Sequence, residues 1–363
     1  MIQTVLGPVA ATGIGAASMH EHLLTDASAL QRPGVEALDP DLPVTADLAA
    51  ALRWSQLALA DNLRLDDLDL LSDELRIAGA AGLGLAVDLS SLGFGPDHAR
   101  LPELSRAAGV GIVAGYGAYL PRLLPDWYLE LDTDGRQQLF ERALTVAVPG
   151  ASHRAGLLGL MGTTTAFGTP DGREERTSLT AAARAAASTG AAVVVRLAAD
   201  ARNGLEVLAH VVAEGVDPSR VVFSTVDEFL DLPYLRDLGQ AGAVLEMCFG
   251  NEGSHVGRIR NASDPQRVDA FLALQESAPE TRWVFGHATW TKGQLRRYGG
   301  AGLDHLTARV VPGLRALGVP DGALTRITVD EPVRLLDMPS ARNAPQPPPP
   351  HRPIRTAPPE EPS

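Results

Sequence analysis

The feature that most constrains the fold is a regular alternation of short apolar segments with helical ones. Each apolar segment is hydrophobic along nearly its whole length, which is typical of strands buried on both faces of a sheet. Helical periodicity and turns marked by glycine or proline separate these segments. Strands that alternate with helices in this way predict a parallel sheet covered by helices. The segments expected to form strands are residues 85–88, 112–115, 157–160, 192–197, 220–223, 243–246 and 283–285.

About eight strand–helix units can be counted, which is the number that closes a (β/α)8 barrel. An open, doubly wound sheet is the alternative, but the glycine-rich nucleotide-binding turns that would support it do not occur in the sequence. We therefore predict an α/β protein with one (β/α)8 TIM barrel over residues 1–338. Residues 339–363 are rich in proline and cannot bury a core, so we predict a disordered tail; a polyproline ligand is the less favoured alternative.

Composition narrows the classes of partner and compartment. The chain has 363 residues and a net charge of −13, which disfavours nucleic acid and acidic membranes as partners. Its single cysteine, Cys248, allows no internal disulfide, which fits a reducing compartment. The N-terminus lacks the basic and apolar regions of a signal peptide, and no apolar run is long enough to span a membrane. We expect a soluble, cytoplasmic protein.

His20 and His22 are the main candidates for metal ligands. Side chains alternate between the two faces of an extended strand, so these imidazoles point the same way and Glu21 points the other way. Two residues along a strand span about 6–7 Å, a separation at which two imidazoles can share one ion. A His-x-His pair is a weak signal by itself, and two hydrogen-bonded polar residues at a strand end are the alternative.

Several segments together resemble the phosphotriesterase family of the amidohydrolase superfamily. The matching segments are residues 4–8, 20–23, 112–119, 179–184, 189–190, 298–302 and 329–332. The resemblance covers residues 2 to 338 approximately. It implies a (β/α)8 barrel that hydrolyses phosphotriesters, lactones or related esters with two divalent ions. In this family the ions are held by the two histidines of the first strand, a bridging lysine or glutamate, two later histidines and an aspartate.

At the aligned positions this sequence keeps only the first pair, His20 and His22. The bridging residue, the two later histidines and the aspartate are replaced by residues unsuited to bind a metal ion: Gly159 or Leu160, Arg196, Thr225 and Ala288. A zinc site needs at least three protein donors, and a guanidinium repels a cation. The resemblance therefore implies at most one zinc or other divalent ion.

Other residues could complete a metal or ligand site. His287, beside Ala288, is the candidate for an additional metal ligand, with a satisfied structural histidine as the alternative. Further options are Asp227, Glu246 and His255, and for Asp227 and His255 we favour a structural role. Cys248 is expected to be a buried, unreactive thiol. Four further histidines are expected to face solvent: His98, His153, His210 and His305.

Two residues are candidates for binding the organic ligand. Arg196 ends an otherwise apolar strand, so we expect it at the mouth of the barrel, paired with an acid or with an anionic ligand. Tyr119 resembles a substrate-pocket residue of the family's lactonases, and a packing tyrosine is the alternative.

The sequence leaves three functions open. The first is a metal-dependent hydrolase of esters, lactones or phosphotriesters with a degraded, at most mononuclear site. The second is a non-catalytic barrel that binds a small anionic ligand or a partner. The third is metal-free chemistry, with His20 or His22 as a general base and Arg196 stabilising negative charge. The expected partner is a small molecule, and we favour one that carries an anionic group. Whether the chain forms a homodimer is left open.

Overall fold

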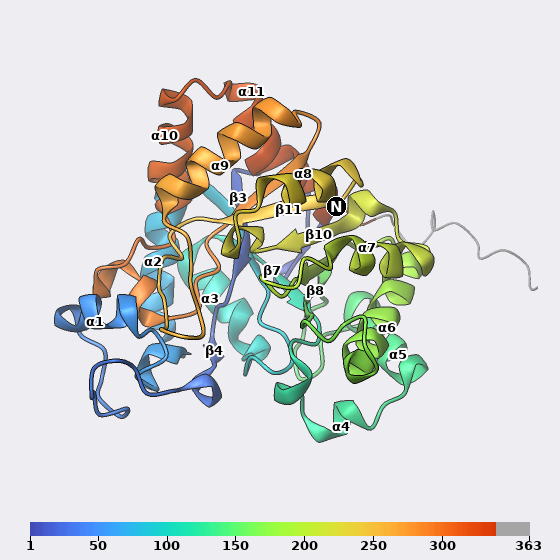
Figure 1. Ribbon diagram of the computed structural model, residues 1–363, viewed down its shortest axis with the longest axis horizontal. Helices are drawn as coiled ribbons and strands as arrows, with labels where there is room; N and C mark the ends of the chain where they lie inside the picture. The colour runs from blue at the N-terminus through green and yellow to red at the C-terminus, as the bar shows by residue number, and fades with distance from the viewer. Residues whose placement is uncertain (339–363) are drawn as a thin grey trace, which may run out of the picture.

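The computed structural model describes residues 1–338, and the tail predicted for residues 339–363 lies outside this part of the chain. Eight parallel strands stand at the centre of the molecule and helices surround them (Figure 1). Their spatial order is β3 (Ala16–Glu21), β6 (Leu83–Asp88), β7 (Gly111–Tyr116), β8 (Leu157–Gly162), β9 (Val193–Arg196), β10 (Val221–Ser224), β11 (Val244–Cys248) and β12 (Arg282–Gly286). Strands that are consecutive in this series are neighbours throughout, which confirms the predicted barrel over an open, doubly wound sheet.

The barrel closes between its last strand and its first. The N–H of Ala288 donates to the carbonyl of His20 over 2.8 Å, and the N–H of His22 donates to the carbonyl of Thr289 over 2.8 Å. Gly286 leaves room for this closure, because a Cβ atom there would come within 2.8 Å of the His20 backbone nitrogen. Barrel closure therefore fixes the backbone that carries both histidines.

Strand β3 contains an irregularity in the interval that includes His20. Ser18 lies opposite Ala86 and Glu21 lies opposite Asp88, so β3 has one more residue than β6 in this interval. An extra residue of this kind is a β-bulge, which locally redirects side chains and is common beside active sites. Simple alternation along β3 does not anticipate it.

Helices cover the outside of the barrel (Figure 1). The longer ones are α2 (Leu68–Ala80), α3 (Leu101–Ala108), α5 (Thr133–Thr145), α6 (Arg173–Thr189), α7 (Gly204–Ala213), α8 (Leu232–Gln240) and α9 (Asp264–Ser277). Carboxylates cap several N-termini: Asp67 accepts from the N–H of Leu70, and Asp231 accepts from the N–H of Tyr234. No helix within residues 1–338 is long and apolar enough to cross a bilayer.

Side chains of each strand alternate between the barrel interior and the layer under the helices. On β11, Val244 packs with the interior cluster, whereas Leu245 and Met247 pack with the outer one. The same alternation turns Glu246 and Cys248 toward the interior. Two polar side chains of β11 therefore enter the barrel close to the end that carries His20.

Candidate functional site

A cavity of about 400 Å³ opens at the carboxyl ends of the strands, the end at which TIM barrels build their active sites. All the sequence positions aligned with metal ligands border it: His20, His22, Leu160, Arg196, Thr225 and Ala288. Phe94, Tyr119 and Trp290 add aromatic surface. The cavity therefore has the location and the lining of an enzyme site.

His20 and His22 face each other at the bottom of this cavity. Their Nε2 atoms lie 3.0 Å apart, and both side chains are buried. The ring of His22 stacks on Phe94 with 4.2 Å between centroids. Burial, and secondarily the proximity of His20, hold the pKa of His22 well below its usual value. His22 is therefore neutral at physiological pH and has a ring nitrogen able to accept a proton or bind a metal ion.

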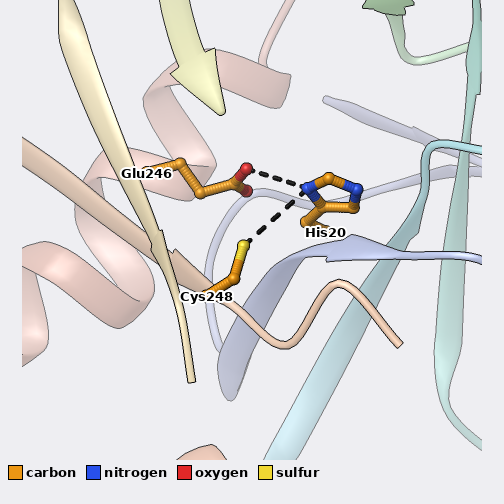
Figure 2. A group of neighbouring side chains, drawn as sticks. All are labelled: His20, Glu246 and Cys248. Atoms are coloured by element: carbon orange, nitrogen blue, oxygen red, sulfur yellow. Dashed lines mark hydrogen bonds and ion pairs between the residues drawn. The ribbon is translucent and has the colours of Figure 1, made fainter. Parts of the chain in front are cut away.

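The opposite edge of the His20 ring faces strands β10 and β11 (Figure 2). Its Nδ1 lies 3.0 Å from Oε2 of Glu246, 2.8 Å from Oγ of Ser224 and 3.9 Å from Sγ of Cys248. Glu246 and Cys248 are fully buried. His20 is thus held between a second imidazole on one edge and a carboxylate, a hydroxyl and a thiol on the other.

Arg196 lies at the mouth of the barrel, on the wall of the cavity. It forms a two-pronged ion pair with Glu228, with 2.6 Å between Nη2 and Oε2 and 3.3 Å between Nε and Oε1. Its guanidinium carbon lies 6.0 Å from the centre of the Tyr119 ring, within the range of a cation–π interaction. Pairing with an acid was one of the two states expected of Arg196, but the sequence did not identify Glu228 as that acid.

His287 lies on the other side of strand β3 from the pair. Its Nδ1 is hydrogen-bonded to Glu21, whose side chain points away from His20 and His22, and its Nε2 accepts the N–H of Leu306 over 3.0 Å. Both ring nitrogens of His287 therefore have hydrogen-bond partners within the protein. This is the arrangement expected of a structural histidine rather than of a metal ligand.

Asp227 and His255 have structural partners, in agreement with the role favoured for them. Asp227 pairs with Arg267 over 2.6 Å, and Nδ1 of His255 accepts the N–H of Leu57. Cys248 is buried, as expected, and burial raises the pKa of its thiol well above the ordinary value.

The prediction that His98 and His153 face solvent is wrong, because both are buried. Nε2 of His98 lies 2.8 Å from the carbonyl oxygen of Ser90. Burial lowers the pKa of each of these histidines to about 4, so both are neutral core residues. The segments that carry them are polar in sequence, and only the packing of the loops around them covers the rings.

The fold is a (β/α)8 barrel with a cavity at the carboxyl ends of its strands, and comparison with known proteins gives the family. A sequence model described as the phosphotriesterase family matches residues 1–336. N-acetyltaurine hydrolase from Homo sapiens is 26% identical over 343 residues, covering 92% of this chain and 97% of that protein. A resiniferatoxin-binding protein from Rhodobacter sphaeroides is 31% identical, with a TM-score of 0.86, over 93% of this chain and 94% of that one. A lactonase from Listeria monocytogenes shares the fold, with 20% identity and a TM-score of 0.73 over 93% of this chain and 98% of that one.

The chain belongs to the phosphotriesterase family, which confirms the resemblance found in the sequence. Curated relatives such as the human protein are named as hydrolases, so a metal-dependent hydrolase fits this chain and a non-catalytic barrel is not favoured.

The residues present do not fit a pair of metal ions, but they fit one. Leu160, Thr225 and Ala288 supply no charged or imidazole donor, and Arg196 brings a cation to the cavity wall. Donors gather instead around His20, with His22 on one edge of its ring and Glu246 and Cys248 on the other. Oε1 of Glu246 is buried without a hydrogen-bond partner among the described residues, which leaves a carboxylate oxygen free to bind a cation.

Proposed function

We propose that the chain hydrolyses an ester, lactone or amide bond in a small anionic molecule, with at most one divalent ion beside His20 and His22. The observation that carries this proposal is the composition of the cavity, in which an imidazole pair lies beneath a wall that carries arginines. An ion held by this pair would lower the pKa of a bound water and polarise the bond to be cleaved.

The protein's own residues have separate tasks in this proposal. When no ion occupies its lone pair, His22, neutral because of its burial, can accept a proton at Nε2 as a general base. Ser90 and Phe94 orient its ring from the far side. Leu160, Phe94 and Trp290 exclude water from the reacting bond.

The charges around the cavity support an anionic substrate. Within the described part of the chain, Glu228 is the one acidic side chain that lines the cavity. Four arginines line it as well: Arg32, Arg122, Arg196 and Arg258. Because Glu228 pairs with Arg196, the other three have no acid among the lining residues. This cluster of positive charge in a chain with a net charge of −13 favours a carboxylate, sulfonate or phosphate group on the substrate.

The relatives' name suggests the first substrate to test. We expect N-acetyltaurine, whose sulfonate would face the arginines, to be cleaved faster than N-acetylethylamine, which lacks the sulfonate. Amine release should be followed for wild type and for His20→Ala, with Arg76→Ala, an exposed arginine away from the cavity, as the matched control. Equal turnover of both compounds would remove the anionic requirement. No turnover of any amide, lactone or phosphotriester in a metal-supplemented panel would refute the hydrolase.

Anion binding can be measured without turnover. Sulfate or taurine at saturating concentration is expected to raise the melting temperature by a few degrees, because a ligand that binds only the folded state stabilises it by mass action. Arg196→Ala should remove most of this rise, since it removes one cation and leaves Glu228 to repel the anion. The double variant Arg196→Ala/Glu228→Gln separates these two effects. A full rise in Arg196→Ala would mean that the anion binds elsewhere.

A cytoplasmic location and a homodimeric assembly remain proposals drawn from the sequence. Light scattering of the purified chain would test the second.

A further inference from the structure

The buried edge of His20 carries a donor set that the hydrolase proposal does not use. His20 belongs to β3, whereas Glu246 and Cys248 both belong to β11 and point into the barrel toward the imidazole (Figure 2). One nitrogen, one carboxylate oxygen and one sulfur, contributed by these three side chains, all lie within 4.8 Å of one another. These are the three donor types that zinc prefers in proteins.

The spacing of these donors suits one tetrahedral zinc ion. With metal–nitrogen and metal–oxygen bonds of about 2.0–2.1 Å and a metal–sulfur bond of about 2.3 Å, tetrahedral geometry separates nitrogen from oxygen by about 3.3 Å and nitrogen from sulfur by about 3.6 Å. The corresponding distances from Nδ1 of His20 are 3.0 Å to Oε2 of Glu246 and 3.9 Å to Sγ of Cys248. Each differs from the ideal by a few tenths of an ångström, a difference that small side-chain rotations correct.

Charge favours the buried edge of His20 over the edge that faces His22. Between two neutral imidazoles a divalent ion would keep its full charge, on a cavity wall that already carries Arg196. The carboxylate of Glu246 and a thiolate of Cys248 would neutralise the ion, which lowers the cost of burying it. In addition, Oε2 of Glu246 already accepts the hydroxyl of Ser224, whereas Oε1 is buried without a partner among residues 1–338, so a rotation of this carboxylate would bring an unsatisfied oxygen to the ion.

We propose that His20, Glu246 and Cys248 form a buried zinc site that joins strand β3 to strand β11. The three ligands are at most 1% exposed, and the cavity is lined by neither Glu246 nor Cys248, so the ion is closed off from substrate. Zinc binding releases the proton of the Cys248 thiol to solvent. The remaining imidazole proton of His20 lies on Nε2, where it is donated to Nε2 of His22, 3.0 Å away.

This site goes beyond the proposed hydrolase and does not depend on it. A neutral imidazole has one lone pair, so His20 can bind an ion on one edge only. When an ion binds to His20, Glu246 and Cys248, His20 is no longer available to an ion in the cavity. The buried donors and the His20–His22 pair therefore compete for one ion per chain.

Cobalt(II) gives a direct test, because a thiolate ligand produces an intense near-ultraviolet charge-transfer band. Cys248 is the only cysteine of the 363-residue chain, so any such band in this chain comes from it. The chain should be stripped with chelator, dialysed and titrated with cobalt(II), and zinc should then displace the cobalt. We expect one equivalent of cobalt and a saturating band in the wild type, followed by loss of the band as zinc replaces cobalt.

Variants identify which edge of the His20 ring binds the metal ion. Cys248→Ser, which is nearly isosteric, should abolish the band and weaken binding at least tenfold, and Glu246→Gln should weaken binding similarly. His22→Asn is the matched control, because it removes the cavity pair and should keep the band. Absence of the band in the wild type would overturn the buried site, whatever the variants do. Loss of metal in His22→Asn with full binding in Cys248→Ser would also overturn it, while leaving the hydrolase proposal standing.

Discussion

Replacing Arg267 with alanine is expected to lower the free energy of unfolding by about 3–5 kcal/mol, as is usual when one partner of a buried ion pair is removed. Arg267 lies on α9 and is fully buried. Its Nε donates to Asp227 over 2.6 Å, its Nη1 to Asp264 over 2.8 Å, and its Nη2 to the carbonyl of Asn251 over 2.6 Å. Without the guanidinium, two carboxylates and a carbonyl lose their charged donor in the interior.

The effect should extend to the candidate site, because Asp227 also accepts the N–H of Cys248 over 2.9 Å. Urea unfolding of Arg267→Ala, Asp227→Ala and the double variant would measure the coupling between the two residues. Arg76→Ala, which breaks an exposed ion pair with Asp73, is the control, and surface pairs contribute only about 0–1 kcal/mol. A loss in Arg267→Ala no larger than in this control would contradict the buried network.

A second large effect is expected at Asp88, the last residue of strand β6. Burial raises the pKa of this carboxyl to about 7, although the N–H of Leu23 and the hydroxyl of Ser90 both donate to it. The folded state therefore keeps its proton at pH values where the unfolded chain has already lost it. The stabilisation from this proton is complete below about pH 4 and is lost as the pH rises through about 7.

The size of the change follows from the width of this pH window. Each pH unit contributes about 1.4 kcal/mol, so roughly three units give about 4 kcal/mol. Asp88→Asn keeps the shape and has no charge to bury, so we expect it to be more stable than the wild type at pH 8 and to lose most of this advantage by pH 4.5. Urea unfolding of both proteins, with chelator present, would measure the difference. Parallel pH profiles would show that Asp88 does not titrate in this window.

The barrel could be predicted from the sequence because its strands are apolar along nearly their whole length. Segments such as 192–195 and 221–223 are apolar at every position, and a parallel sheet covered by helices buries both sides of such strands. The bulge in β3 could not be predicted, because it results from pairing with β6 rather than from local sequence. Helix α5 is not indicated by apolar periodicity for a related reason: its buried Arg136, which packs over Tyr128, interrupts the periodicity on which a helix prediction depends.

The candidate site was predictable only where it repeats a family motif. His20 and His22 follow from the opening motif, and the replacements at residues 160, 196, 225 and 288 follow from alignment. The contacts that give the site its chemistry join residues far apart in the chain, such as Arg196 with Glu228 and His20 with Glu246. In the sequence Glu246 is one of three further options, beside Asp227 and His255, and nothing in the local sequence places it and Cys248 at the edge of the His20 ring.

Metal content per chain is the most direct test of a single-ion site centred on His20. The wild type and His20→Ala should be purified without chelator, dialysed at neutral pH and analysed by inductively coupled plasma mass spectrometry. We predict at most one equivalent of divalent metal in the wild type and none in His20→Ala, because both donor sets share this imidazole. Two equivalents of zinc that survive dialysis would contradict the account, since they would mean that the family's dinuclear site assembles despite Leu160, Arg196, Thr225 and Ala288.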